Sequence, residues 1–89
     1  PLMLAAKESK GNLFKFLINN GANVEQKDKS GWTALMWAVA NNNINIVKLL
    51  INRRVRINNV DKFGFTALNL AHNEGFDNLI KVLKKAGAR

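Results

Sequence analysis

A repeat of 33 residues constrains the fold of this chain more than any other feature of its sequence. Residues 28–40 read DKSGWTALMWAVA and residues 61–73 read DKFGFTALNLAHN, and the two segments share Asp, Lys, Gly, Thr, Ala, Leu and Ala at identical places. A second shift of 33 residues brings the segment that begins at Leu2 into the same register. Periods of this length are typical of stacked supersecondary units, none of which can bury its apolar face alone.

The residues of the middle unit predict two short helices. Asp28–Gly31 is a turn signal, because Asp can bond its own backbone and Gly accepts a positive φ. Thr33 stands where a helix cap is needed, directly before the apolar segment ALMWAVA at residues 34–40. The triplet Asn41–Asn43 is expected to end this helix, and a second helix is expected over about Ile44–Asn52.

The second helix of each unit needs a stop signal, and two units supply a glycine. The helix expected around Leu13–Asn19 is followed by Gly21, and the one around Leu79–Lys85 is followed by Gly87. Glycine is the favoured left-handed terminator of a helix. The middle unit has Arg54 at this place, which costs on the order of 1 kcal/mol if the backbone is unchanged.

This pattern resembles the ankyrin repeat. The matching residues are D-x-x-G-x-T-A-L at Asp28–Leu35 and Asp61–Leu68, IVKLL at Ile46–Leu50 and NNGANV at Asn19–Val24. The resemblance covers essentially the whole chain. It implies an all-α repeat solenoid, in which an ankyrin-type stack of helix-turn-helix units is joined by β-hairpin loops.

The register divides the chain into a partial first repeat at residues 1–27, a second at 28–60 and a third at 61–89, all within one continuous domain. The first repeat lacks its hairpin, and its apolar surface residues lack the polar character of an end cap, so we expect at least one further repeat upstream. These apolar residues are Leu2, Leu4, Phe14, Phe16 and Ile18.

The third repeat has the composition of a carboxy-terminal cap. Asn69, His72 and Lys84 stand where the earlier repeats have apolar residues. Burying an unpaired ammonium group is prohibitively costly, so this side of the third repeat is expected to face water.

The sequence offers little for catalysis. It has no cysteine and a single histidine, His72, which is expected to be a surface residue of the cap. Asp28 and Asp61 are better explained as turn formers than as a catalytic carboxylate pair. Without a phosphate-binding loop or metal-ligand spacing, we expect no enzyme activity, cofactor or metal in these 89 residues, although a catalytic domain upstream is compatible with the sequence.

Protein recognition is the better interpretation. In the family that the chain resembles, partners dock on a concave face made by hairpin tips and first helices. Carried over by repeat position, that face comprises Lys29, Ser30, Trp32, Ala40, Asn41 and Arg53 from the second repeat, Lys62, Phe63, Phe65, Asn73 and Glu74 from the third, and Lys7, Glu8 and Asn20 from the first.

Aromatic side chains in the hairpins are the most informative members of this set. Trp32 and Phe65 are equivalent positions, Phe63 lies beside them, and Lys29 and Lys62 flank them. Exposed aromatic groups next to cations are typical interface anchors. The alternative is that Trp32 and Phe65 only pack on each other between hairpins. A second tryptophan, in the first helix of the same repeat at position 37, is expected in the core.

The net charge of +8, from 14 Lys and Arg against 6 Asp and Glu, favours an acidic partner. One alternative is a polyanion-binding surface that uses Arg53, Arg54 and Arg56. The basic residues are nevertheless scattered around each repeat by sequence, and no nucleic-acid-binding fold is present, so nucleic acid is the less favoured partner.

The expected function is therefore a monomeric, non-catalytic module that recruits another protein, within a larger protein. The absence of cysteine and of a long apolar segment favours an intracellular, cytoplasmic protein without a membrane span. The heavy use of Asn, Lys and Ile suggests an AT-rich genome, and a further alternative is the targeting arm of a bacterial effector enzyme in the host cytosol.

Overall fold

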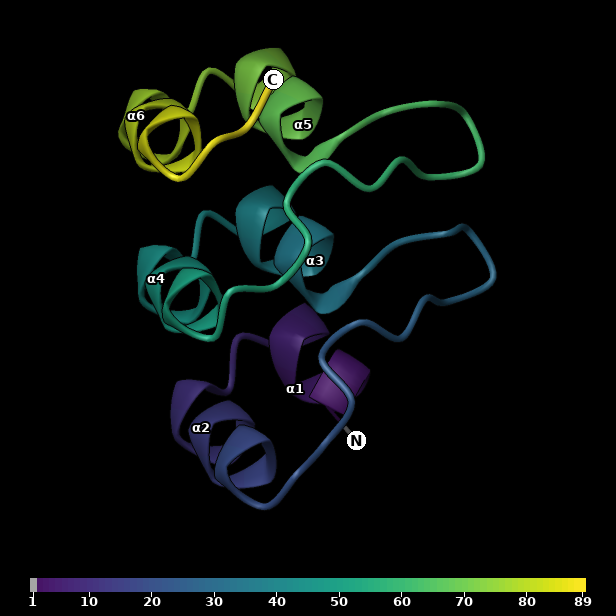
Figure 1. The fold of residues 1–89 in the computed structure, drawn as a ribbon, viewed down its shortest axis with the longest axis vertical. Helices are drawn as coiled ribbons and strands as arrows, with labels where there is room; N and C mark the ends of the chain where they lie inside the picture. Colours follow the sequence, from purple (N-terminus) through teal and green to yellow (C-terminus); the bar gives the residue numbers. More distant parts are fainter. Residues whose placement is uncertain (1) are drawn as a thin grey trace.

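The computed structural model describes residues 2–89, and within them the chain forms six α-helices (Figure 1). All are short, between 6 and 9 residues long. In chain order they are α1 (Leu2–Lys7), α2 (Gly11–Asn19), α3 (Ala34–Ala40), α4 (Ile44–Asn52), α5 (Ala67–Glu74) and α6 (Asp77–Lys85).

The helices form three antiparallel pairs that stack in chain order (Figure 1). The inner helices α1, α3 and α5 form one row and contact one another in sequence, and the outer helices α2, α4 and α6 form the second row. Two long loops project from the stack, one before α3 and one before α5. This arrangement confirms the predicted 33-residue units, with α2 and α6 each beginning two residues earlier than expected.

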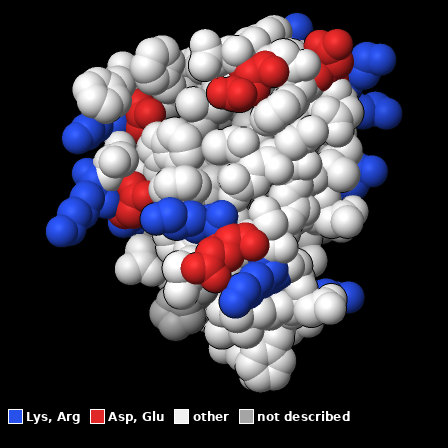
Figure 2. All heavy atoms as spheres, turned by 180° about the vertical axis from the view of Figure 1, so that it is seen from behind, with Lys and Arg blue, Asp and Glu red and all other residues white. Residues whose placement is uncertain are grey.

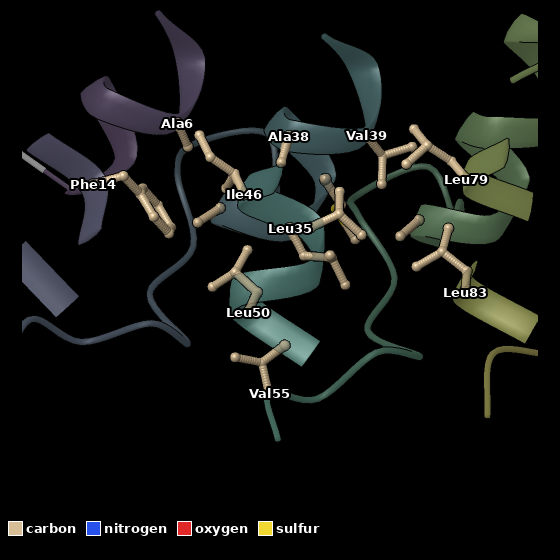
Figure 3. Close-up of a cluster of buried hydrophobic side chains, with 14 of the residues drawn as sticks. Ala6, Phe14, Leu35, Ala38, Val39, Ile46, Leu50, Val55, Leu79 and Leu83 are labelled. Carbon is tan, nitrogen blue, oxygen red and sulfur yellow. The ribbon is translucent and has the colours of Figure 1, made fainter. Parts of the chain in front are cut away.

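The middle repeat supplies the centre of the core (Figure 3). Ile46, Val47 and Leu50 on α4 are at most 1% exposed. Phe14 lies on the first-repeat side of this layer, and Leu79 lies on the third-repeat side. Because apolar side chains from three repeats meet in one continuous cluster, each repeat completes the interior of its neighbour.

The two projecting loops have the shape of hairpins, but residues 2–89 contain no β-strand, so the expected β-hairpins are turns without a ladder. Each loop closes on itself through two backbone hydrogen bonds. Asp28 N donates to Trp32 O and Gly31 N donates to Asp28 O, and the second loop repeats the pattern with Asp61, Phe65 and Gly64. Successive hairpins are joined where Lys62 N donates to Ser30 O at 3.0 Å.

Polar side chains begin the helices as the sequence predicts. Thr33 Oγ1 accepts from Met36 N at the start of α3, and Thr66 forms a full capping box with Asn69 at the start of α5. Two residues of the asparagine triplet form the turn between α3 and α4. Asn42 adopts a positive φ of 52°, and Asn43 caps the start of α4 by accepting a hydrogen bond from Ile46 N.

Arg54 adopts the left-handed backbone conformation that its repeat position requires. Its φ is 57°, against 88° for Gly21 and 104° for Gly87. Arg54 N donates to Ile51 O at 2.9 Å, so the turn that ends α4 keeps its hydrogen bond despite the side chain. The backbone at Arg54 therefore keeps the left-handed conformation of the glycine positions, which is the condition for the strain cost expected from the sequence.

The two ends of the stack differ in polarity. In the third repeat Asn69, His72 and Lys84 are exposed to water, as the sequence predicts. In the first repeat Phe16 is 61% exposed and Leu4 is 54% exposed.

Not every apolar residue of the first repeat lies at the surface. Leu2, Phe14 and Ile18 are buried against the second repeat, so their assignment to an uncapped surface was wrong. Leu13 takes their place: it is 44% exposed, although its counterparts Ile46 and Leu79 are fully buried. The difference arises because a preceding repeat covers Ile46 and Leu79 in this structure and none covers Leu13.

Candidate partner-binding face

We call the surface formed by the two hairpins (residues 28–32 and 61–65) and the inner helices α3 and α5 the hairpin face. The hairpins extend away from the helices and stand beside the amino-terminal ends of α3 and α5 (Figure 1). This surface therefore combines rigid helix positions with side chains that the loops hold away from the core.

One aspartate organises each hairpin. Asp61 Oδ1 accepts hydrogen bonds from Phe63 N at 2.8 Å and from Phe65 N at 2.9 Å. Asp28 Oδ1 accepts from Ser30 N and Trp32 N, each at 2.9 Å. Both carboxylates therefore act as turn formers, as the sequence predicts, and they fix the backbone that carries the aromatic side chains.

The second oxygen of each aspartate binds an indole. Trp32 Nε1 donates to Asp61 Oδ2, and Trp37 Nε1 donates to Asp28 Oδ2, both at 2.9 Å. The two rings meet edge-on, with centroids 4.7 Å apart and planes inclined at 61°. The aromatic partner of Trp32 is thus Trp37 and not Phe65, and Trp32 is half-buried.

These hydrogen bonds lower the pKa of both aspartates. The bond from Phe65 N, supported by those from Phe63 N and the Trp32 indole, lowers the pKa of Asp61 against the opposing effect of burial. For Asp28, burial raises the pKa, but the bonds from Trp32 N, the Trp37 indole and Ser30 N, together with Lys7, outweigh it and lower the pKa overall. Both groups are ionised at neutral pH.

The family model for ankyrin repeats (3 copies) matches residues 2–89 of the sequence. The chain belongs to the ankyrin-repeat family. Ankyrin repeats are in general non-catalytic modules for protein–protein interaction. No curated protein matches the sequence closely enough for comparison.

Within this ankyrin stack, the hairpin of the third repeat presents two exposed aromatic groups. Phe63 is 72% exposed and Phe65 is 51% exposed. The Lys62 ammonium lies 5.2 Å from the centroid of the Phe63 ring, which satisfies the distance for a cation–π contact. A cavity of about 310 Å³ opens beside Phe65, and its other lining residues on α5 are Asn69, Leu70 and Asn73.

Asn41, a predicted face residue, and Trp37, predicted in the core, both have structural roles in the second repeat. Asn41 Nδ2 donates to the carbonyl oxygens of Ala6 at 3.2 Å and Lys7 at 2.8 Å, which ties α3 to the end of α1. Trp37, expected in the core, is only partly buried, and the Lys7 ammonium lies 5.2 Å from its ring centroid. The indole N–H of Trp37 was the sequence signal for this half-buried position, because a buried N–H needs a hydrogen-bond acceptor.

The remaining predicted residues differ in location and in exposure. Arg53 lies away from the hairpin face, because its guanidinium donates to Asn19 between α2 and α4. Ala40 is half-buried on α3. The others are exposed: Lys29, Ser30, Lys62, Asn73, Glu74, Glu8 and Asn20.

The single histidine and the metal-ligating residue types are the remaining candidates for chemistry. His72 is exposed and makes no side-chain hydrogen bond within residues 2–89. The same residues include no group of three or more metal-ligating side chains. None of the helices at positions 2–85 is long and apolar enough to cross a membrane.

Proposed function

We propose that the hairpin face binds an acidic segment of another protein, with Phe63 and Phe65 as the main anchors. The observation that carries this proposal is the exposure of Phe63 (72%) and Phe65 (51%), together with the cavity beside Phe65. Aromatic side chains that lose this much exposed area on binding are typical hot spots of protein interfaces.

The cavity next to Phe65 suits an apolar side chain of the partner. Phe65 and Leu70 provide apolar walls, and Asn69 and Asn73 provide amides at the rim. Asn69 Oδ1 already accepts from Thr66 N, which leaves its amide hydrogens available to a partner carbonyl. The site therefore combines an apolar pocket with convergent hydrogen-bond donors.

The net charge of +8 favours an acidic partner, which exposed lysines of this face can contact, although Glu8, Glu74 and the two hairpin aspartates add negative charge there. Lys29 and Lys62 are exposed at equivalent hairpin positions, and Lys7 lies over Trp37. The carboxylates of Asp28 and Asp61 each accept three hydrogen bonds from within the chain, so their role is to stabilise the hairpins. An acidic segment would gain in association rate from this field.

A peptide library displayed on phage tests the proposal directly. We expect selection against this chain to enrich peptides that combine acidic residues with an apolar or aromatic anchor. The enriched peptides should lose binding to a Phe63→Ala/Phe65→Ala variant. Peptides that bind this variant as well as the original chain would refute the assignment.

A matched control is available in the same chain. Phe16 is 61% exposed but lies on the outer helix α2. Its replacement by Ala removes a comparable exposed ring and should leave peptide binding unchanged.

Within a larger protein, this module would recruit the partner. The alternative is that the larger protein is an enzyme that acts on the recruited protein.

A further inference from the structure

The outer helices carry a basic groove that is separate from the hairpin face. A groove of about 370 Å³ lies between α2 and α4. Its polar lining consists of three cations and three amides: Lys15, Lys48, Arg53, Asn19, Asn45 and Asn52. Leu49 provides the apolar part of the lining.

The repeat itself brings these cations together. Lys15, Lys48 and Lys81 are 33 residues apart and therefore occupy the same place on α2, α4 and α6. Neighbouring helices pack with their axes about 8–10 Å apart, so successive lysines of this set line one side of the stack. Stacking therefore places three of the 14 basic residues in one row.

No carboxylate opposes this positive charge. Residues 9–24 and 29–60 contain neither Asp nor Glu, and these ranges include all of α2 and α4. Glu25, which lies between the two ranges, accepts a hydrogen bond from Arg56 N at 3.0 Å. Along the edge formed by the outer helices, at the right in Figure 2, basic groups recur, and acidic groups appear only near the top.

The groove also provides directed hydrogen-bond donors. The Arg53 guanidinium is held across the groove by its bond to Asn19 Oδ1, so a side chain of the second repeat is fixed against the first. The amides of Asn45 and Asn52 line the same groove and make no side-chain hydrogen bond within residues 2–89. An anion rich in oxygen acceptors would match both the charge and these amide donors.

We propose that the groove between α2 and α4 binds a small, multiply phosphorylated anion, such as an inositol polyphosphate or the equivalent lipid headgroup. Phosphate oxygens would lie between Lys15, Lys48 and Arg53, with the asparagine amides completing the contacts. A guanidinium pairs well with phosphate because its N–H groups form a planar fork. This site is independent of protein recognition at the hairpin face.

Isothermal titration calorimetry with inositol hexakisphosphate as the probe tests this site. We expect a 1:1 complex whose affinity falls at least tenfold in a Lys15→Gln/Lys48→Gln variant. The control variant Lys29→Gln/Lys62→Gln removes the same charge from the hairpins and should lose less than threefold. An Asn45→Ala variant keeps the charge and should lose several-fold, since an amide donor is removed.

The outcomes separate a built site from a diffuse positive field. Equal losses in both lysine variants, together with no effect of Asn45→Ala, would overturn the proposal, as would the absence of any binding. Sedimentation with vesicles that contain 5% phosphatidylinositol 4,5-bisphosphate distinguishes the two sources of the headgroup. Binding to the free probe alone supports a soluble ligand, and binding to both supports a lipid. Preference for a duplex oligonucleotide over the probe would contradict the proposal.

Discussion

Trp32 Nε1 donates a 2.9 Å hydrogen bond to Asp61 Oδ2, and this bond joins the hairpin of the second repeat to that of the third. Asp61 uses its other oxygen to hold the backbone of Phe63 and Phe65. One carboxylate thus connects the stacking of the repeats to the position of the proposed anchors. Stability and recognition are expected to be coupled at this residue.

Removing the indole N–H from either tryptophan should destabilise the stack. Trp32→Phe and Trp37→Phe retain an aromatic ring but leave Asp61 Oδ2 or Asp28 Oδ2 without its donor. We expect each change to lower the Tm by on the order of 5 °C, because an acceptor loses its partner. Thermal unfolding followed by circular dichroism measures the effect. An unchanged Tm in both variants would show that the indole bonds contribute nothing to stability.

Acid should destabilise the protein through the same two aspartates. The pKa values of Asp28 and Asp61 are lowered in the folded state, so on acidification the unfolded chain takes up protons first. Their contribution is complete above the unfolded value of about 3.9 and is lost as the pH falls from there through the folded values. Urea unfolding between about pH 3 and pH 7 should show this loss.

The control for the acid effect is Asp28→Asn/Asp61→Asn. This double variant cannot titrate at these positions, so its stability should fall less steeply below about pH 4. If the double variant proves too unstable for denaturation, NMR titration of the carboxyl carbons in the original chain provides the folded pKa values directly. Folded pKa values at or above 3.9 would contradict the stated direction.

Arg54→Gly should stabilise the protein. Arg54 has a φ of 57°, a strain of about 1–2 kcal/mol that glycine avoids, against an entropy cost of about 0.5–1 kcal/mol for glycine. We expect a net gain of about 0.5–1 kcal/mol in the free energy of unfolding. The matched control is Arg53→Gly, which removes the same charge at a φ of −87° and should destabilise the protein. A gain in both variants would indicate a charge effect instead of relieved strain.

Equivalent positions in the three repeats should respond differently to truncation. Ile46→Ala and Leu79→Ala remove fully buried side chains and should each cost about 2–5 kcal/mol in the free energy of unfolding. Leu13→Ala removes a side chain that is 44% exposed and should cost about 1 kcal/mol or less. Denaturant titrations of the three variants provide the comparison. A cost at Leu13 equal to that at Ile46 would contradict the burial pattern.

The fold could be predicted from the sequence because the same turn, cap and apolar signals recur in successive repeats. Thr33, Gly21 and the apolar stripe of α4 each identify a local element, and the 33-residue register states how the elements stack. The absence of strand pairing in the hairpins could not be foreseen. It depends on the turn geometry, which Asp28 and Asp61 fix by accepting hydrogen bonds from backbone N–H groups of their own loops.

The candidate site was less accessible to sequence reasoning, because equivalent positions do not have equivalent neighbours. Trp32 and Phe65 align in the repeat, yet only Trp32 has a following hairpin whose Asp61 can accept its N–H. Within residues 2–89 no further hairpin packs against Phe65, which is 51% exposed. The 33-residue spacing of Lys15, Lys48 and Lys81 is visible in the sequence, but only the stacking of the outer helices shows that these lysines form a row.

The central claim is that the aromatic part of the hairpin face holds the partner. The most direct test is the dissociation constant of a selected partner peptide for the original chain, the Phe63→Ala/Phe65→Ala variant and the Phe16→Ala variant. The first variant should bind at least tenfold more weakly, since hot-spot aromatics each contribute about 1–2 kcal/mol or more, and the second should bind as tightly as the original chain. Equal affinity in all three, or a loss confined to Phe16→Ala, would contradict the account.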